Sequence, residues 1–179
     1  MLSYSGKEVL QMKLRKASRE DEAAVLELYG EASRFLAAQG IDQWQDGYPN
    51  GETFRGDLSR GESWVLEEDG EVLATACLGF GREPTYDKIC QGAWAVEPPE
   101  YAFLHRIAVS EKLRGKNAPG LFFSQLEQDA RGRGLLCLRG DTHRGNKIMQ
   151  HVLEKNGLAY RGIIYLEDGD ERLAFEKLL

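Results

Sequence analysis

The chain has 179 residues, of which 42% are hydrophobic and 29% charged, with a formal net charge of −6. This length suffices for one domain with its own core, while the lack of a long apolar run excludes a membrane-spanning helix. Net negative charge disfavours general nucleic-acid binding. Three widely spaced cysteines argue against a disulfide framework or a metal site. We therefore expect a reduced, cytoplasmic protein without a bound metal and without nucleic-acid or membrane partners.

The N-terminus has no signal-peptide pattern, and residues 1–11 are expected to form a loose extension. One domain is expected over residues 12–179. Its first strand is predicted at 12–17, and Ser18 begins a helix whose apolar residues recur at helical spacing as far as Gly40.

The later elements follow from turn residues and hydrophobic periodicity. Asp69 and Gly70 separate two β-rich runs, which is typical of a hairpin. In chain order the sequence predicts a loop (41–50), a short helix (51–60), a hairpin (63–81), an irregular segment (82–100), a strand (101–109), a helix ending near Gly132, a strand (135–142), a helix (143–156) and a last hairpin (158–166 and 171–179). This order predicts a single α/β (α+β) domain, with a mixed, mostly antiparallel sheet flanked by helices on both faces.

The segment 109–127, "VSEKLRGKNAPGLFFSQLE", joins a strand to a helix through a turn rich in cations and glycine. It opens a window, residues 112–147, with eight basic and three acidic residues, so a local charge of +5 lies within an acidic chain. The first N–H groups of a helix are unpaired and partly positive, so such a turn suits an anion. The pattern predicts a phosphate-binding turn, although a plain capped loop would have the same composition.

This turn, the strand "LHRIAV" before it and "NKIMQHVLEKNGL" after it resemble the GNAT superfamily of acyl-CoA-dependent N-acyltransferases. The superfamily pattern has an Arg/Gln-x-x-Gly-x-Gly/Ala turn, then Asn-x-x-Ala and Tyr-Glu-Lys-x-Gly-Phe. The resemblance covers residues 12–179 and implies acetyl-CoA as co-substrate. The residues that it implies for binding acetyl-CoA are Ile107, Ala108, Val109, Arg114, Gly115, Lys116, Asn117, Ala118, Gly120 and Asn146.

The chain departs from that pattern at several positions, among them Leu158 in place of the final phenylalanine. Asn117 replaces the first glycine of the turn, and Pro119 replaces a residue whose N–H would face the pyrophosphate. Leu153 replaces the tyrosine that usually protonates the departing thiolate. Tyr160 and Tyr165 are the alternatives for that acid, and we select Tyr160; both could equally be core residues of a strand.

Acyl transfer to an amine also needs a base and a polarised carbonyl. His105 is the best candidate base, because strand periodicity would place it on the same face as Ile107 and Val109. A buried histidine with a satisfied hydrogen bond is the competing interpretation. The end of the next strand offers His143 as a second candidate base. Turn or helix-cap roles are expected there for Asp141 and Thr142.

The acceptor pocket is expected at the loop after the first helix, where Trp44 and Tyr48 offer aromatic rings to an amine. Trp44 could instead fill the edge of the core. The function expected is transfer of an acetyl group from acetyl-CoA to a small-molecule or peptide amine by direct attack. Whether the chain forms a homodimer is left undecided by the sequence. The alternatives are a non-catalytic acyl-CoA-binding module and a structural domain with a degenerate cleft.

Overall fold

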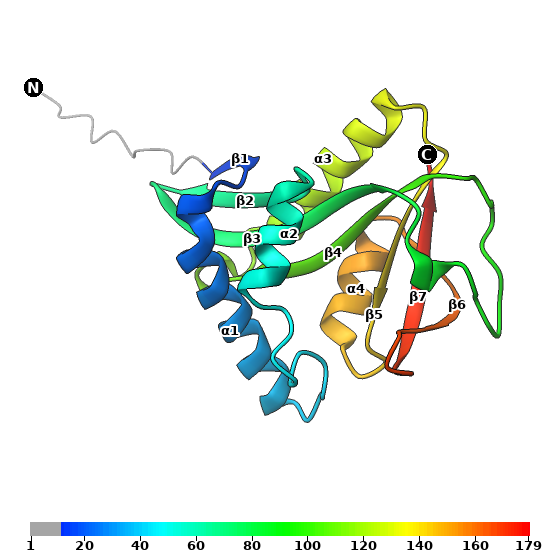
Figure 1. The fold of residues 1–179 in the computed structure, drawn as a ribbon, viewed down its shortest axis with the longest axis horizontal. Coiled ribbons are helices and arrows are strands. Elements are labelled where there is room, and N and C mark those ends of the chain that lie inside the picture. Colours follow the sequence, from blue (N-terminus) through cyan, green and yellow to red (C-terminus); the bar gives the residue numbers. More distant parts are fainter. Residues whose placement is uncertain (1–11) are drawn as a thin grey trace, which may run out of the picture.

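The computed structural model describes residues 12–179, and the expected extension at 1–11 lies outside the described residues. Seven strands form one sheet in the order β1-β2-β3-β4-β5-β7-β6 (Figure 1). The strands are β1 (Met12–Lys16), β2 (Ser63–Glu68), β3 (Glu71–Gly81), β4 (Tyr101–Val109), β5 (Cys137–Thr142), β6 (Ala159–Tyr165) and β7 (Glu171–Leu178). The helices are α1 (Glu22–Ala38), α2 (Gly51–Ser59), α3 (Ala118–Gly132) and α4 (Lys147–Lys155), with short 3-10 turns at Arg19–Asp21, Pro84–Tyr86 and Glu111–Leu113.

Helices cover both faces of the sheet, and the pairing is antiparallel except between β4 and β5, which confirms the predicted fold class. Helices α1 and α2 pack with Val65 and Ala108 on one face. Helices α3 and α4 enclose the larger core on the other face, around Phe122 and Leu153. Among residues 12–179, no helix is both long and apolar enough to cross a membrane.

Strand β4 contains a bulge that the period-2 expectation does not anticipate. Thr75 and Cys77 of β3 pair with Ala108 and His105, so β4 carries one extra residue between them. Arg106, at the bulge, has a positive φ of 52°. The expectation that His105 shares a face with Ile107 and Val109 is therefore wrong.

The bulge turns consecutive side chains of β4 toward the same side of the sheet. Ile107 packs in the core under α3, whereas His105 lies against Phe103, with ring centroids 5.0 Å apart, and Arg106 reaches Asp57 of α2. The polar side chains of β4 thus gather on the α1–α2 face.

Strands β4 and β5 separate after a short parallel contact. Only Ala102 and Phe103 of β4 pair with β5, at Leu138 and Arg139. Beyond Phe103 the β5-facing edge of β4 has no strand partner within the described residues, so a gap opens in the middle of the sheet. This gap is the structural basis of the cleft described next.

Candidate active site

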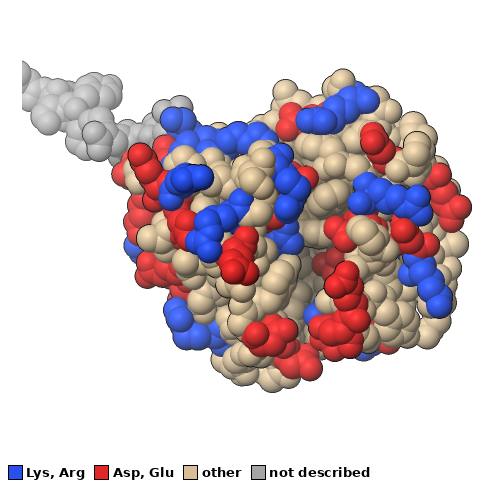
Figure 2. Space-filling view, in the orientation of Figure 1, with Lys and Arg blue, Asp and Glu red and all other residues tan. Residues whose placement is uncertain are grey.

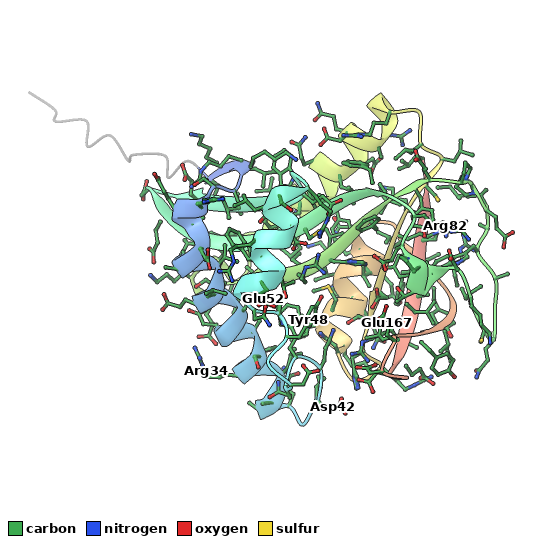
Figure 3. All side chains as sticks on the ribbon, in the orientation of Figure 1. Arg34, Asp42, Tyr48, Glu52, Arg82 and Glu167 are labelled. Atoms are coloured by element: carbon green, nitrogen blue, oxygen red, sulfur yellow. The ribbon has the colours of Figure 1, made fainter. Side chains whose placement is uncertain are left out.

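A cleft of about 1680 Å³ lies where β4 and β5 diverge. Its walls come from α1, the α1–α2 loop, β4, the start of α3, the β5–α4 region and the β6–β7 turn. Figure 2 shows the corresponding hollow, with acidic side chains on both sides of its lower part. Tyr48 of the α1–α2 loop and Glu167 of the β6–β7 turn both line it, from opposite walls (Figure 3).

The turn before α3 has the backbone that the sequence suggests for an anion site. Gly115 has φ 79°, and Asn117 adopts the left-handed conformation at the helix N-terminus. Arg114 and Pro119 line the cleft, whereas Gly115, Lys116, Asn117, Ala118 and Gly120 are not among the lining residues. Lys116 instead binds Glu68, with its Nζ 2.9 Å from both carboxylate oxygens. The turn thus presents Arg114 and Pro119 to the cleft.

The unpaired edge of β4 forms one wall of the cleft, through Ile107, Ala108 and Val109. A buried hydroxyl faces the same space, because Thr142 is 1% exposed and its Oγ1 has no hydrogen-bond partner among residues 12–179. Buried polar groups normally have partners. A ligand with amide groups, such as the pantetheine arm of acetyl-CoA, would fit both features.

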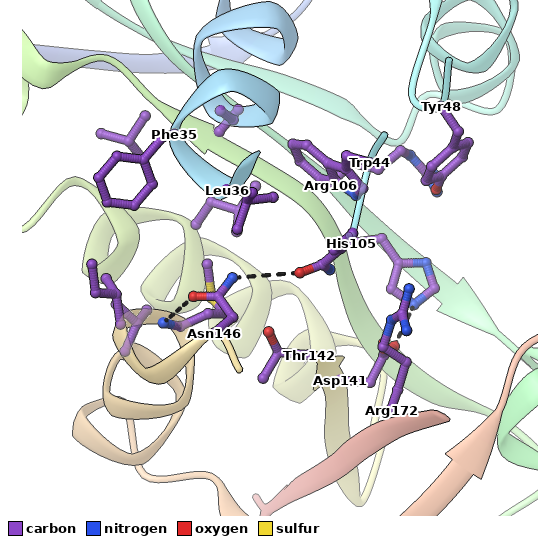
Figure 4. Close-up of a pocket in the computed structure, with 18 of the residues that line it drawn as sticks. Phe35, Leu36, Trp44, Tyr48, His105, Arg106, Asp141, Thr142, Asn146 and Arg172 are labelled. Atoms are coloured by element: carbon purple, nitrogen blue, oxygen red, sulfur yellow. Dashed lines mark hydrogen bonds and ion pairs between the residues drawn. The ribbon is translucent and has the colours of Figure 1, made fainter. Parts of the chain in front are cut away.

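Asn146 caps α4, because its Oδ1 accepts a hydrogen bond from Met149 N at 3.0 Å. Its amide nitrogen lies 3.5 Å from Gln43 Oε1 across the cleft (Figure 4). The expected helix start at 143 is therefore wrong by four residues. Asp141 and Thr142 are strand residues of β5, and the expected cap roles for them are wrong.

Leu153 is 1% exposed and lies in the core under α4, where it also borders the cleft. No hydroxyl is available there, as the sequence indicates. Tyr160 does not replace it: the ring is 48% exposed on β6, packs edge-on against Phe175, and is absent from the cleft wall. Tyr165 is likewise outside the wall, so the structure separates both tyrosines from His105.

His105 lies in the cleft wall within a polar network that the sequence does not reveal. Tyr86 Oη donates to Asp141 Oδ2 at 2.7 Å and lies 3.0 Å from His105 Nε2. Because a hydroxyl has one hydrogen, Nε2 must carry the proton that Tyr86 accepts. The lone pair of His105 is then on Nδ1, which lies 3.8 Å from Glu83 Oε2.

Burial governs the protonation states in this network. Burial, followed by the Arg106 charge, lowers the pKa of His105 to about 3, so the imidazole is neutral at physiological pH. Burial also raises the pKa of the Asp141 carboxyl, against the hydrogen bond from Tyr86 and the charge of Arg172. The neutral imidazole is a weak base, although its ring can still accept a hydrogen bond.

Tyr86 and Glu83 come from the segment 82–100, which the sequence marks as irregular. Trp94 Nε1 donates to Tyr86 O at 2.9 Å, and Cys90 pairs with Ile163 of β6 through both backbone hydrogen bonds. These contacts fix a segment without regular structure over the sheet. No periodicity or motif in the sequence signals this role.

Arg106 organises the opposite wall. Its Nε and Nη2 donate to the two carboxylate oxygens of Asp57 at 2.8 and 2.6 Å, and its Nη1 donates to Tyr48 Oη at 2.9 Å. Trp44 lines the cleft and also packs edge-on against Tyr29 at the rim of the α1 core, so both interpretations of Trp44 apply.

One group of potential metal ligands occurs in the described part of the chain, formed by Asp57, Glu62 and Cys77. Both oxygens of Asp57 already accept from guanidinium groups of Arg60 and Arg106. We therefore assign no metal to this group.

Comparison with known proteins places this geometry in a family. The sequence profile described as "Acetyltransferase (GNAT) family" matches residues 23–158. A GNAT-family acetyltransferase from Streptococcus agalactiae 2603 is 37% identical, over 95% of this chain and 97% of that one, with a TM-score of 0.82. The chain belongs to the GNAT acetyltransferase family. No curated protein matches it in sequence.

Other GNAT-like structures support the fold alone. A GNAT-family acetyltransferase from Listeria monocytogenes 4b F2365 is 17% identical over 95% of this chain and 96% of that one, with a TM-score of 0.70. The structure of yncA from Salmonella typhimurium, with its cofactor acetyl-CoA, is 20% identical over 94% of each chain, with a TM-score of 0.62. The GNAT assignment thus rests on the profile and on the streptococcal structure.

Proposed function

We propose that this GNAT protein transfers an acetyl group from acetyl-CoA to a primary amine by direct attack. The observation that carries this proposal is the cleft at the unpaired edge of β4, which has free backbone groups along Ile107–Val109 and the orphaned Thr142 hydroxyl. Membership of the GNAT family supports acetyl-CoA as the donor, and so does the yncA structure of the same fold.

Arg114 and the N-terminus of α3 suit the phosphates of acetyl-CoA, because unpaired helix N–H groups and a guanidinium both favour anions. The other residues of the turn act through its shape. Asn117 supplies the left-handed backbone, and Gly120 leaves room for the Asn117 side chain, since a Cβ at Gly120 would lie 2.4 Å from its Nδ2.

The amine is placed by two acceptors that face each other. His105 Nδ1 and Glu83 Oε2 are 3.8 Å apart, and both line the cleft as hydrogen-bond acceptors. An amine nitrogen between them would donate one N–H to each. Such positioning accounts for much of the rate of a bimolecular reaction.

In the reaction, the nitrogen lone pair forms a bond to the acetyl carbonyl carbon. The carbon–sulfur bond then breaks, and the sulfur leaves with its electron pair. The nitrogen becomes strongly acidic once the new bond forms, so a weak base is sufficient to take its proton. His105 Nδ1 and Glu83 are the two groups that can accept this proton. Tyr86 and Asp141 hold the imidazole in the tautomer that leaves Nδ1 free.

No tyrosine is needed at position 153 for the sulfur to depart. An ordinary thiol has a pKa of about 8.5, so its thiolate is a competent leaving group that takes a proton from water afterwards. The buried Leu153 is therefore compatible with turnover.

The test is thiol release from acetyl-CoA in the presence of a panel of primary amines, with the acetylated products identified by mass spectrometry. We expect amine-dependent release of coenzyme A and an N-acetylated product. Binding of acetyl-CoA without transfer to any amine would favour the alternative of a non-catalytic acyl-CoA-binding module.

A further inference from the structure

Arg172 is a buried cation in the cleft wall, at the end nearest the β6–β7 turn. Its side chain is 7% exposed. Its Nη1 donates to Glu171 O at 2.9 Å, and its Nη2 lies 3.7 Å from Asp170 Oδ2, on a half-exposed carboxylate. Figure 4 shows Arg172 beside Asp141 and close to His105 in this view.

The protein leaves most of this guanidinium without a partner. A guanidinium has five N–H donors in a planar fork, and a buried charge is costly unless it is paired. Among residues 12–179, Arg172 has the one hydrogen bond and the one loose ion pair just described. Arg106, on the opposite wall, is by contrast fully engaged by Asp57 and Tyr48.

Asp141, in the network with Tyr86 and His105, is not an ion-pair partner of Arg172. Asp141 feels the charge of Arg172, but its Oδ2 is taken by the Tyr86 hydroxyl, and it forms no ion pair within 4.0 Å of Arg172. The fork therefore has donors free for a planar anion, and Arg–carboxylate pairs are the usual bidentate match.

We propose that the acceptor is a primary amine that also carries a carboxylate, such as an amino acid, and that Arg172 binds this carboxylate. This inference rests on the proposed function. The amine end lies between His105 Nδ1 and Glu83, which line the same part of the cleft. The ammonium group of the zwitterion first loses one proton to water, which frees the lone pair. The products are the N-acetyl amino acid and coenzyme A, with the second nitrogen proton transferred as described above.

The charges around this end favour a zwitterion over a plain anion. Exposed carboxylates of Asp42, Glu167 and Asp168 stand at the mouth and attract the ammonium group. Arg172 is more buried than these carboxylates, and its positive charge would pair with the carboxylate of the acceptor. A polyamine would suit the acidic mouth but would place no anion on Arg172, so it is the competing acceptor class.

The experiment compares matched pairs of acceptors with the full-length protein and acetyl-CoA. Each amino acid in the panel, including β- and γ-amino acids, is paired with its carboxamide, and polyamines are included. The amide has a less basic amine, so intrinsic reactivity at neutral pH favours the amide. We expect kcat/KM to be at least 10-fold higher for the acid member of the best pair.

Variants of Arg172 test whether this residue causes the preference for the amino acid over its amide. Arg172→Gln is expected to lower kcat/KM for the amino acid by roughly 10- to 100-fold, mainly through KM, and to lower it by a much smaller factor for the matching amide. Arg172→Lys is expected to recover part of the loss. Unchanged acetyl-CoA affinity of the variants, measured by calorimetry, shows that they fold.

Two results separate the inference from the proposed function. Acetylation of amides or polyamines as fast as amino acids, with no effect of Arg172→Gln on selectivity, would overturn the inference and leave the acetyltransferase standing. No transfer to any amine would remove the proposed function and the inference together.

Discussion

His105 shows how one side chain changes character between sequence and fold. The strand pattern indicates a candidate base, but only the structure reveals that burial keeps the ring neutral and that Tyr86 fixes its tautomer. A low pKa has a consequence for stability, because the unfolded chain binds a proton near pH 6.5 that the folded chain refuses. Stability from this group is thus present above pH 6.5 and is lost as the pH falls toward 3.

We therefore expect the wild type to lose more stability on acidification than His105→Gln, which has no titrating ring. The difference in unfolding free energy between pH 7 and pH 4 should reach up to about 3 kcal/mol. Urea unfolding at both pH values measures it, and Asp141 is present in both proteins. Equal losses would mean that His105 keeps an ordinary pKa.

Tyr86 offers the second test at this scale. Its hydroxyl is the shared partner of His105 Nε2 and Asp141 Oδ2, and the residue is 1% exposed. Tyr86→Phe keeps the ring but frees the tautomer of His105. We expect kcat to fall by roughly 10- to 100-fold, less than the typical contribution of a positioned acid–base group, because Tyr86 acts through His105.

Acetyl-CoA affinity of Tyr86→Phe should stay unchanged, because Tyr86 does not line the cleft. Tyr160→Phe is the matched control, since that tyrosine lies outside the cleft and should leave both kcat and affinity intact. A normal kcat in Tyr86→Phe would exclude the network from the reaction.

Among the elements, β4 differs most from what its sequence pattern predicts, because of its bulge. Its apolar run and the glycine-rich turn after it predict a strand followed by a helix, and both are found, whereas anion binding at the helix start stays a prediction. The bulge at Arg106 is not predictable from alternation, and it coincides with an ion pair between Arg106 and Asp57 of α2, which are far apart in the sequence. Segments such as 82–100 also escape prediction, because tertiary contacts, not periodicity, fix them.

The Arg106–Asp57 pair should be important for stability, because it is nearly buried, at 12% and 2% exposure. Removing one partner leaves an uncompensated buried charge. We expect Asp57→Ala to lower the free energy of unfolding by roughly 3–5 kcal/mol in urea titrations.

Asp87→Ala is the control for that experiment, since Asp87 pairs with Arg82 on the exposed surface. It should cost less than about 1 kcal/mol. Equal effects of the two substitutions would contradict the importance for stability given to the buried Arg106–Asp57 pair.

For the whole molecule, the family pattern and the order of elements are sufficient to predict the fold class and a mixed, mostly antiparallel sheet, but not which strands pair in parallel. They cannot supply Glu83, Tyr86 or Arg172, because these residues meet only when irregular segments and distant strands converge. Tyr160 is the converse case, since its residue type fits an acid but its strand places it outside the cleft.

The central claim is that the cleft at the divergence of β4 and β5 binds acetyl-CoA. Isothermal titration calorimetry of acetyl-CoA into the wild type tests it most directly, beside Arg114→Ala in the cleft wall and Arg131→Ala on the exposed side of α3. We expect micromolar binding that Arg114→Ala weakens and Arg131→Ala does not. No detectable binding by the wild type would contradict the account.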